Sequence, residues 1–181
     1  MNNKIVKLAL ILFLVCAITA GVLGGVHMLT KDRIADYKAQ KRADAFATVL
    51  KSESYTDIPF DKESNPRVTN ISKADGGEGW VVESTFPGAQ GNISMVTGVS
   101  PDYKCTGISI VSHSETSGLG ANAASTAEVG VNFRNQFIGA DDSVALTKSG
   151  GDIDALTGAT ITSRSVTEAV AAVITACENL G

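Results

Sequence analysis

The sequence predicts an α+β protein, in which a membrane-spanning helix precedes one domain built from an antiparallel sheet and flanking helices. Three observations favour this class. An uncharged stretch of 22 residues near the N-terminus is long enough to cross a bilayer. Three strand-like runs separated by turn residues follow in the middle of the chain, and two stretches with helical spacing of apolar residues lie in its last third.

The uncharged stretch, residues 8–29, is predicted to be an uncleaved membrane anchor. A cleavable signal peptide is the alternative, because Lys4 and Lys7 form a basic region and residues 18–20 resemble a cleavage site. The apolar run continues to Leu29, however, and so exceeds the roughly 7 to 15 residues of a signal-peptide core. The anchor is therefore favoured.

The charges that flank the anchor predict its orientation. Lys4 and Lys7 precede it, whereas the basic and acidic residues that follow largely cancel, so the N-terminus is expected in the cytoplasm and the domain outside. Apolar residues at helical spacing, without Gly or Pro, extend the helix outward. We therefore expect an anchor at residues 1–30, a helical stalk at 31–52 and an extracytoplasmic domain at 53–181.

Charge and cysteine content exclude several classes of function. From residue 31 onward the chain has 13 Lys and Arg against 19 Asp and Glu, which argues against nucleic acid as a partner. Cys16, Cys105 and Cys177 form no C-x-x-C pair, so neither an iron–sulfur cluster nor a structural metal site is predicted. Cys16 follows Val15, where a lipoprotein would need a small residue. A disulfide between Cys105 and Cys177 and two free, partly buried thiols both remain open.

The expected elements of the domain follow in chain order. Residues 53–77 are rich in Ser, Asp, Asn, Gly and Pro and are expected to form a loop or a weakly structured connection. Strands are predicted at 80–86, 93–99 and 105–113, as an antiparallel meander. Val129, Phe133 and Phe137 predict an amphipathic helix at 125–138, closed by Gly139, and a second helix is predicted at 163–180.

The segment before the last helix, D-A-L-T-G-A-T-I-T-S at 154–163, has the composition of a helix entrance. Its hydroxyl side chains can cap free amides, and Gly158 permits a sharp turn. Taken alone, this pattern is common and has a purely structural interpretation. The free N–H groups and the helix dipole would nevertheless favour a phosphate, and Gly158 and Ala159 leave its approach open. Arg164 is either a further positive charge for that phosphate or simply an exposed side chain.

Residues 154–160 resemble the D-x-x-[ST]-G-A-T flavinylation motif of the FMN-binding domain family. The resemblance implies that a separate flavin transferase attaches FMN, through its phosphate, to Thr160. The matching positions that would surround the cofactor are Thr157, Gly158 and Ala159, with Thr162 following as in many members. Asp154 would be recognised by the transferase; the alternative is an exposed turn residue.

A second stretch, H-S-E-T-S-G-L-G at 113–120, resembles the H-x-E-T-P-G-L-G segment of the G subunit of Rnf complexes, and residues 133–139 are also similar to that protein. Ser117 departs from the usual Pro. We expect this stretch to form one wall of the site for the isoalloxazine ring, because glycines allow close approach of backbone to a flat ring. Its expected cofactor-binding residues are Glu115, Thr116, Gly118, Leu119 and Gly120, with a solvated carboxylate as the alternative for Glu115.

The resemblance implies an electron-transfer flavoprotein subunit of a membrane-bound ferredoxin:NAD oxidoreductase that translocates Na⁺ or H⁺. Its partners would be the other membrane subunits, and it would have no complete active site of its own. The alternatives are the usually longer C subunit of a sodium-translocating NADH:quinone oxidoreductase and a non-enzymatic anchored assembly protein. A hydrolase built on His113 and Glu115 is disfavoured, because no nucleophile elbow or metal-ligand set accompanies them. Trp80, Phe133 and Phe137 are expected in the core rather than against the flavin.

Overall fold

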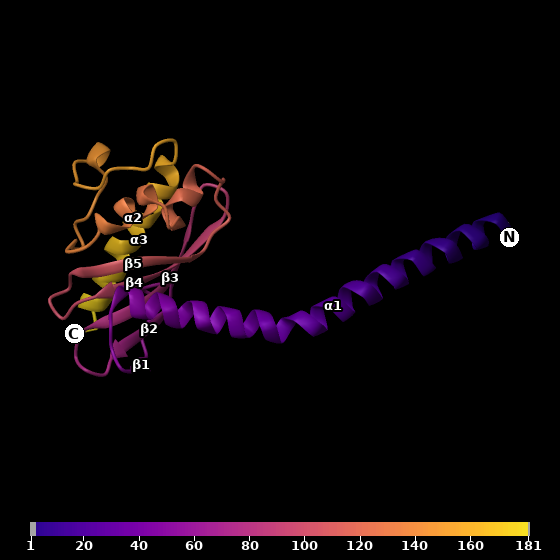
Figure 1. Cartoon of the computed structure of the whole chain (residues 1–181), viewed down its shortest axis with the longest axis horizontal. Helices are drawn as coiled ribbons and strands as arrows, with labels where there is room; N and C mark the ends of the chain where they lie inside the picture. Colours follow the sequence, from indigo (N-terminus) through magenta and orange to yellow (C-terminus); the bar gives the residue numbers. More distant parts are fainter. Residues whose placement is uncertain (1–2, 181) are drawn as a thin grey trace. The chain divides into compact units, whose positions relative to one another are not determined.

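The computed structural model describes residues 3–180, which divide after Lys41 into two compact units. Helix α1 (Asn3–Val49) begins in the first unit and ends in the second (Figure 1). Its apolar side chains between Ile5 and Leu29 are exposed, as expected of a surface that contacts lipid. Within residues 3–180, α1 is the one helix long and apolar enough to cross a membrane. The predicted N-terminal apolar helix is confirmed.

The second unit is built on a five-stranded antiparallel sheet whose strands follow one another in chain order. The strands are β1 (Tyr55–Asp57), β2 (Val68–Ala74), β3 (Trp80–Pro87), β4 (Asn92–Val99) and β5 (Cys105–Ser112). The predicted meander corresponds to β3, β4 and β5 and is confirmed, as is the α+β class.

The expectation of a loop at residues 53–77 is wrong, because β1 and β2 lie within it. Their polar residues suit the edge of a sheet, where side chains can bond to one another. Asn70 and Ser72 on β2 both donate to a carboxylate oxygen of Asp57 on β1, at 2.8 and 2.6 Å. Only Val68, Ile71 and Ala74 of β2 are buried apolar residues, which is too few to give the sequence a strand-like pattern.

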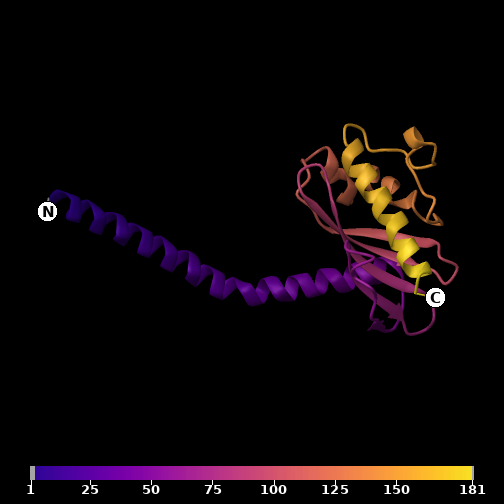
Figure 2. The same cartoon turned by 180° about the vertical axis from the view of Figure 1, so that it is seen from behind.

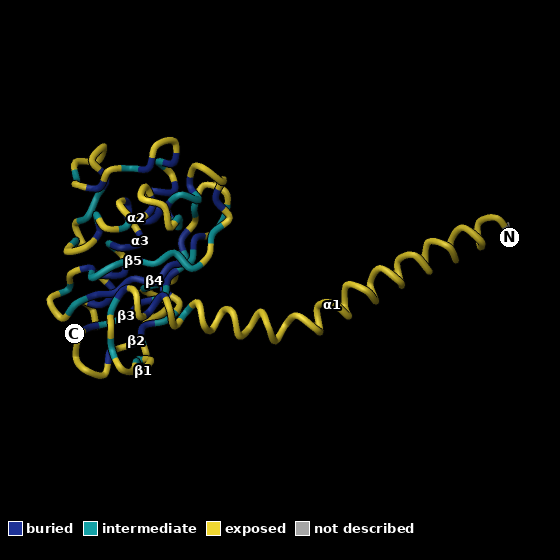
Figure 3. Tube along the Cα trace, in the orientation of Figure 1, coloured by how far each residue is buried: buried dark blue, intermediate teal, exposed yellow. Residues whose placement is uncertain are grey.

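One face of the sheet is covered by helix α3 (Thr160–Glu178), which crosses it in Figure 2. Val166, Val170 and Val173 of this helix are buried in a core with Val82 and Met95 of the sheet, the dark blue region of Figure 3. Burial of these apolar side chains is the main stabilising contribution to this half of the domain.

The aromatic residues expected in the core are found there. Phe133 and Phe137 are buried and meet edge to face, with ring centroids 5.4 Å apart. Trp80 is partly buried and stacks on Tyr103, with ring centroids 5.5 Å apart. Trp80 also lies at the end of β3 opposite to the β3–β4 turn.

The opposite face of the sheet is covered by the last two turns of α1, residues 42–49. Phe46 and Val49 pack there against Val81 and Val96. Thr106 Oγ1 donates a hydrogen bond to the carbonyl oxygen of Val49, at 2.6 Å. Gly98 makes this approach possible, because a Cβ atom there would lie 2.6 Å from the same oxygen. The end of the stretch expected to form a stalk is therefore part of the domain core.

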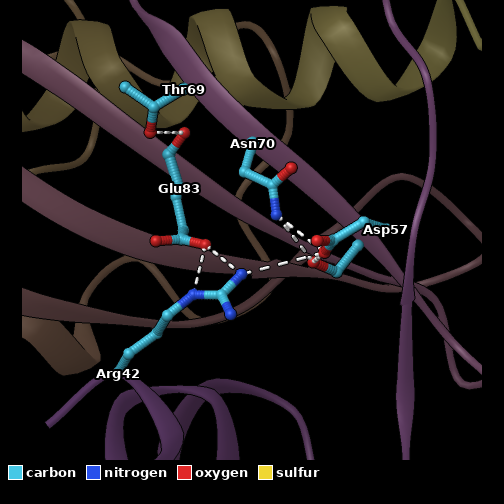
Figure 4. A network of polar contacts seen from close by, with 6 residues as sticks. Arg42, Asp57, Thr69, Asn70 and Glu83 are labelled. Atoms are coloured by element: carbon cyan, nitrogen blue, oxygen red, sulfur yellow. Dashed lines mark hydrogen bonds and ion pairs between the residues drawn. The ribbon is translucent and has the colours of Figure 1, made fainter. Parts of the chain in front are cut away.

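Polar contacts fix the same turns of α1 to the sheet edge (Figure 4). The Nε atom of Arg42 donates to Glu83 Oε1 at 2.6 Å, and its guanidinium lies 3.7 Å from Asp57. The hydrogen bond with Glu83 raises the pKa of Arg42, and hydrogen bonds from Ser72 and Asn70 lower the pKa of Asp57. The network therefore joins α1, β1, β2 and β3 through side-chain hydrogen bonds and ion pairs.

The remaining helices differ from prediction at their ends. Helix α2 (Glu128–Asn135) is shorter than the expected 125–138, and α3 begins at Thr160 rather than at residue 163. Val129, expected in the buried stripe, is exposed, and the neighbouring Gly130 is buried instead. A Cβ atom at Gly130 would lie 2.4 Å from the carbonyl oxygen of Asn122, so α2 packs closely on the 3₁₀ helix η1 (Gly120–Ala124) through a residue without a side chain. A second 3₁₀ helix, η2 (Thr147–Ser149), precedes α3.

Candidate functional site

The two motifs singled out in the sequence meet in one hollow of about 340 Å³ at the end of the sheet. Three segments line it: the β3–β4 turn, the loop from β5 into η1, and the start of α3. The lining residues are Ala89 and Gln90; Glu115, Thr116, Leu119 and Gly120; and Gly158, Ala159, Thr160, Ile161 and Thr162. The two motifs, about 40 residues apart in the sequence, are thus brought to one place.

The start of α3 offers free backbone donors to this hollow. Ala159 caps the helix without a side-chain hydrogen bond, so the expected hydroxyl cap is wrong. Ser163 instead accepts from the Leu156 amide and donates to the Ala159 carbonyl, both at 2.9 Å, which holds the turn from inside. Among residues 3–180, no acceptor meets the N–H groups of residues 160–162. These donors, at the positive end of the helix dipole, suit a phosphate.

Gly158 lets the two motifs approach each other. Its φ of +72° lies in the left-handed region, which favours glycine. A Cβ atom there would also lie 3.0 Å from Leu119 Cδ2, an apolar side chain of the other motif that is 44% exposed. The backbone before Thr160 therefore turns over Leu119 without obstruction.

Glu115 is buried, with only 8% of its surface exposed, so the solvated carboxylate considered as an alternative is wrong. Thr162 Oγ1 donates a hydrogen bond to Glu115 Oε2, and the backbone N–H of Gln90 donates to Oε1 at 3.1 Å. The backbone N–H of Glu115 donates to His113 Nδ1 at 3.2 Å. His113 and Glu115 are thus joined through the backbone and do not form an acid–base pair of side chains.

Other predicted residues lie beside the hollow without lining it. Asp154, Thr157 and Gly118 are exposed. The backbone of Asp154 pairs with the side-chain amide of Gln136, at 2.7 and 3.3 Å, which leaves its carboxylate directed to solvent. Arg164 is exposed and lines a separate hollow with Glu168, so it does not add charge to the site.

Sequence reasoning missed Ala89, Gln90 and Ile161. The P-G-A-Q-G-N segment carries no chemical signal and by itself indicates only a turn. The register of the strands shows why this turn lines the site. Pro87 pairs with Asn92 at the β3–β4 turn, and Ser94 pairs with Ser112 at the end of β5. The turn and the end of β5 therefore lie at the same end of the sheet. Ile161 is 64% exposed, immediately after Thr160.

The cysteines take no part in the site. Cys105 and Cys177 are buried free thiols, and burial raises the pKa of each to about 12. The open question of a disulfide is thus answered by the free-thiol alternative. Among the described residues, no group of His, Cys, Asp and Glu is arranged to hold a metal ion.

Comparison with known proteins identifies the family. Residues 88–175 match the model of the FMN-binding domain, and residues 1–49 match that of the RnfG N-terminal region. The chain is 33% identical over 180 residues to the G subunit of the ion-translocating oxidoreductase complex of Methanosarcina acetivorans, covering 93% of this chain and 92% of the relative. This chain belongs to the Rnf G-subunit family.

Two further members of the Rnf G-subunit family are similar over most of their length. The G subunit of the Na⁺-translocating ferredoxin:NAD⁺ oxidoreductase complex of Acetobacterium woodii is 31% identical over 196 residues, covering 96% of this chain and 92% of the relative. The proton-translocating counterpart of Clostridium ljungdahlii is 30% identical over 174 residues, covering 93% and 89%. The family relationship and the apolar helix together indicate association with a membrane.

The two matched regions can be placed on the structure. The RnfG N-terminal match ends at residue 49, where α1 ends. The FMN-binding match contains every residue that lines the hollow, from Ala89 to Thr162. The hollow is therefore the candidate FMN site of this domain.

Proposed function

We propose that this chain is an electron-transfer flavoprotein subunit that carries FMN esterified through its phosphate to Thr160. One observation carries the proposal: Thr160 is the first residue of α3, and it lines the hollow beside the unpaired N–H groups. The FMN phosphate would accept hydrogen bonds from those groups while bonded to the Thr160 oxygen.

The hollow fits the flavin by size and lining. Its volume of about 340 Å³ is near the lower end of the roughly 300 to 1,000 Å³ of small-molecule sites, so it holds part of the cofactor and leaves the rest accessible. Leu119 and Ile161 offer apolar surface to the ring. When bound, FMN supplies transfer of one or two electrons, which no side chain of this domain offers. Partial exposure suits exchange of electrons with a neighbouring carrier.

Attachment is proposed to require a separate flavin transferase. A threonine hydroxyl needs an adjacent base to act as a nucleophile. Glu115 is the only titratable side chain in the lining, and its two oxygens already accept hydrogen bonds from Thr162 and Gln90. The exposed Asp154 and Thr157 precede Thr160 and are available for recognition by the transferase.

The partners are proposed to be the other subunits of an Rnf complex that couples ferredoxin:NAD⁺ oxidoreduction to ion transport. The relatives in Acetobacterium woodii and Clostridium ljungdahlii are named for Na⁺ and for protons, yet their identities to this chain are 31% and 30%. Similarity in this protein therefore does not distinguish the ions. The chain would contribute one electron-transfer station rather than a complete active site.

Intact mass of the purified chain tests the covalent linkage. After co-expression with a flavin transferase, we expect the denatured chain to be heavier by one FMN minus one water. The transferase would take FMN from FAD: the Thr160 oxygen, losing its proton, displaces AMP from the FMN phosphate, and AMP is released. The same chain from a host without the transferase is the control and should have the mass of the bare polypeptide. A bare mass in both preparations, with FMN released on denaturation, would contradict covalent attachment.

We also propose that the chain crosses the membrane once, with a cytoplasmic N-terminus and residues beyond the anchor outside. Lys4 and Lys7 before the apolar stretch support this orientation. Protease added to intact spheroplasts should therefore digest the domain, as seen with an antibody against its C-terminus. Digestion only after the membrane is permeabilised would reverse the assignment.

A further inference from the structure

The carboxylate of Glu115 joins three segments of the flavin site. One oxygen accepts the Thr162 hydroxyl from the first turn of α3, and the other accepts the Gln90 N–H from the β3–β4 turn. Glu115 itself belongs to the loop after β5. The three segments that line the hollow therefore meet at this one buried side chain.

Two glycines leave the space that this carboxylate occupies. A Cβ atom at Gly88 would lie 2.4 Å from Glu115 Oε1, and one at Gly120 would lie 2.5 Å from Oε2. The Cβ at Gly120 would also lie 2.5 Å from Thr162 Oγ1. Any larger residue at either position would displace the carboxylate, so backbone from two segments closes directly around it.

Within residues 3–180, no ion pair involves this buried carboxylate. The ion pairs of the described residues join Arg42 to Asp57 and Glu83, and Lys104 to Asp141, but none includes Glu115. Burying a carboxylate with only neutral donors around it costs free energy, which an apolar residue would not. We therefore look for the role of Glu115 in the hydrogen bonds that its carboxylate accepts.

We propose that Glu115 is a positioning residue, which holds the first turn of α3 against the β3–β4 turn and thereby fixes Thr160 for flavin attachment. The inference rests on the proposed attachment of FMN to Thr160. Thr162 is two residues after Thr160 and only 1% exposed, so the direction of its hydroxyl fixes the rotation of the first helical turn. Glu115 thus acts on Thr160 through Thr162.

Substitutions at both ends of the hydrogen bond test the proposal, with the rate of flavin attachment by the transferase as the first measurement. Glu115→Ala and Thr162→Val remove one partner each and should slow attachment by about tenfold to a hundredfold, since a small misplacement of a reacting group has effects of this size. Glu115→Gln should restore most of the rate lost in Glu115→Ala, because a glutamine oxygen can accept from Gln90 while its amide donates to the Thr162 hydroxyl. Thr162→Ser should likewise restore the rate lost in Thr162→Val.

Glu128→Gln is the matched control, because Glu128 is an exposed carboxylate at the start of α2. It should leave the rate unchanged. Attachment to Glu115→Ala at the wild-type rate would overturn the proposal. So would a Glu115→Gln variant as slow as Glu115→Ala, because the charge rather than the hydrogen bonds would then be responsible.

Hydrogen–deuterium exchange of the chain without flavin gives an independent measurement. Glu115→Ala and Thr162→Val should speed exchange in residues 155–163, while β4 keeps its protection. Unchanged exchange in residues 155–163 would overturn the proposal. If β4 also loses protection in Glu115→Ala, that variant is disturbed beyond the site. The comparison of Thr162→Val with Thr162→Ser then tests the proposal instead. A wild-type chain that never gains covalent flavin would instead refute attachment at Thr160. Hydrogen–deuterium exchange would still show whether Glu115 positions the first turn of α3.

Discussion

Replacing Thr160 with Ala is expected to abolish covalent flavin completely while the domain stays folded. The Thr160 side chain makes no hydrogen bond among residues 3–180, and Ala is the best helix former, so the change in stability should stay within about 0.5 kcal/mol. The loss of flavin would therefore reflect loss of the attachment oxygen. A denaturing gel under ultraviolet light makes the measurement: the wild-type band should fluoresce and the Thr160→Ala band should be dark.

Thr175→Ala is the matched control, because Thr175 is an exposed threonine near the other end of the same helix. Its band should fluoresce like the wild type. A fluorescent Thr160→Ala band, or a flavinylated peptide mapped to Thr157 or Thr162, would contradict attachment at Thr160. Equal amounts of folded protein in all three preparations are required, and circular dichroism can establish this.

Replacing Phe46 with Ala is expected to destabilise the domain by about 3 to 5 kcal/mol, the usual cost of removing a buried aromatic ring. Phe46 is 5% exposed and packs against the sheet, where the ring of Tyr55 on β1 meets it edge to face at 5.1 Å. The Arg42 guanidinium lies 4.6 Å from the Phe46 ring, so this cation–π contact would also be lost. Urea unfolding of the detergent-solubilised chain, followed by the fluorescence of its single tryptophan, measures the effect.

Tyr37→Ala provides the comparison for Phe46→Ala. Tyr37 is an aromatic residue of the same helix, is 64% exposed and lies before the domain unit that starts at Arg42. Its removal should change the free energy of unfolding by no more than about 0.5 kcal/mol. Equal unfolding midpoints for the two variants would mean that residues 42–49 do not contribute to the core.

The sequence predicted the elements whose patterns are local. The apolar helix is a long uncharged run, strands β3 to β5 are short apolar runs between turn residues, and α3 has apolar residues at helical spacing. The candidate site residues came from resemblance, because residues 113–120 and 154–160 match motifs of a known family, whereas each segment taken alone is a common loop or helix entrance. Residues of both segments line one hollow, and their roles toward the flavin stay predictions.

Features that depend on contacts between residues far apart in the chain could not be predicted from local sequence patterns. The polar strand β2 is a strand because it pairs with β3, and Val129 is exposed because Gly130 makes the closer contact with η1. The burial of Glu115 depends on Gln90 and Thr162, which are 25 and 47 residues away along the chain. No local property of Glu115 distinguishes it from a solvated carboxylate.

The order of elements along the chain has a consequence for maturation. Each strand of the sheet pairs with its neighbour in sequence, whereas α3 meets β3 and β4 only across at least 61 residues. Contacts between distant residues carry a larger entropic cost of loop closure and tend to form later in folding. We therefore expect the meander to assemble first and α3 to dock last. Because α3 completes the hollow, attachment of FMN at Thr160 would mark chains in which folding has finished.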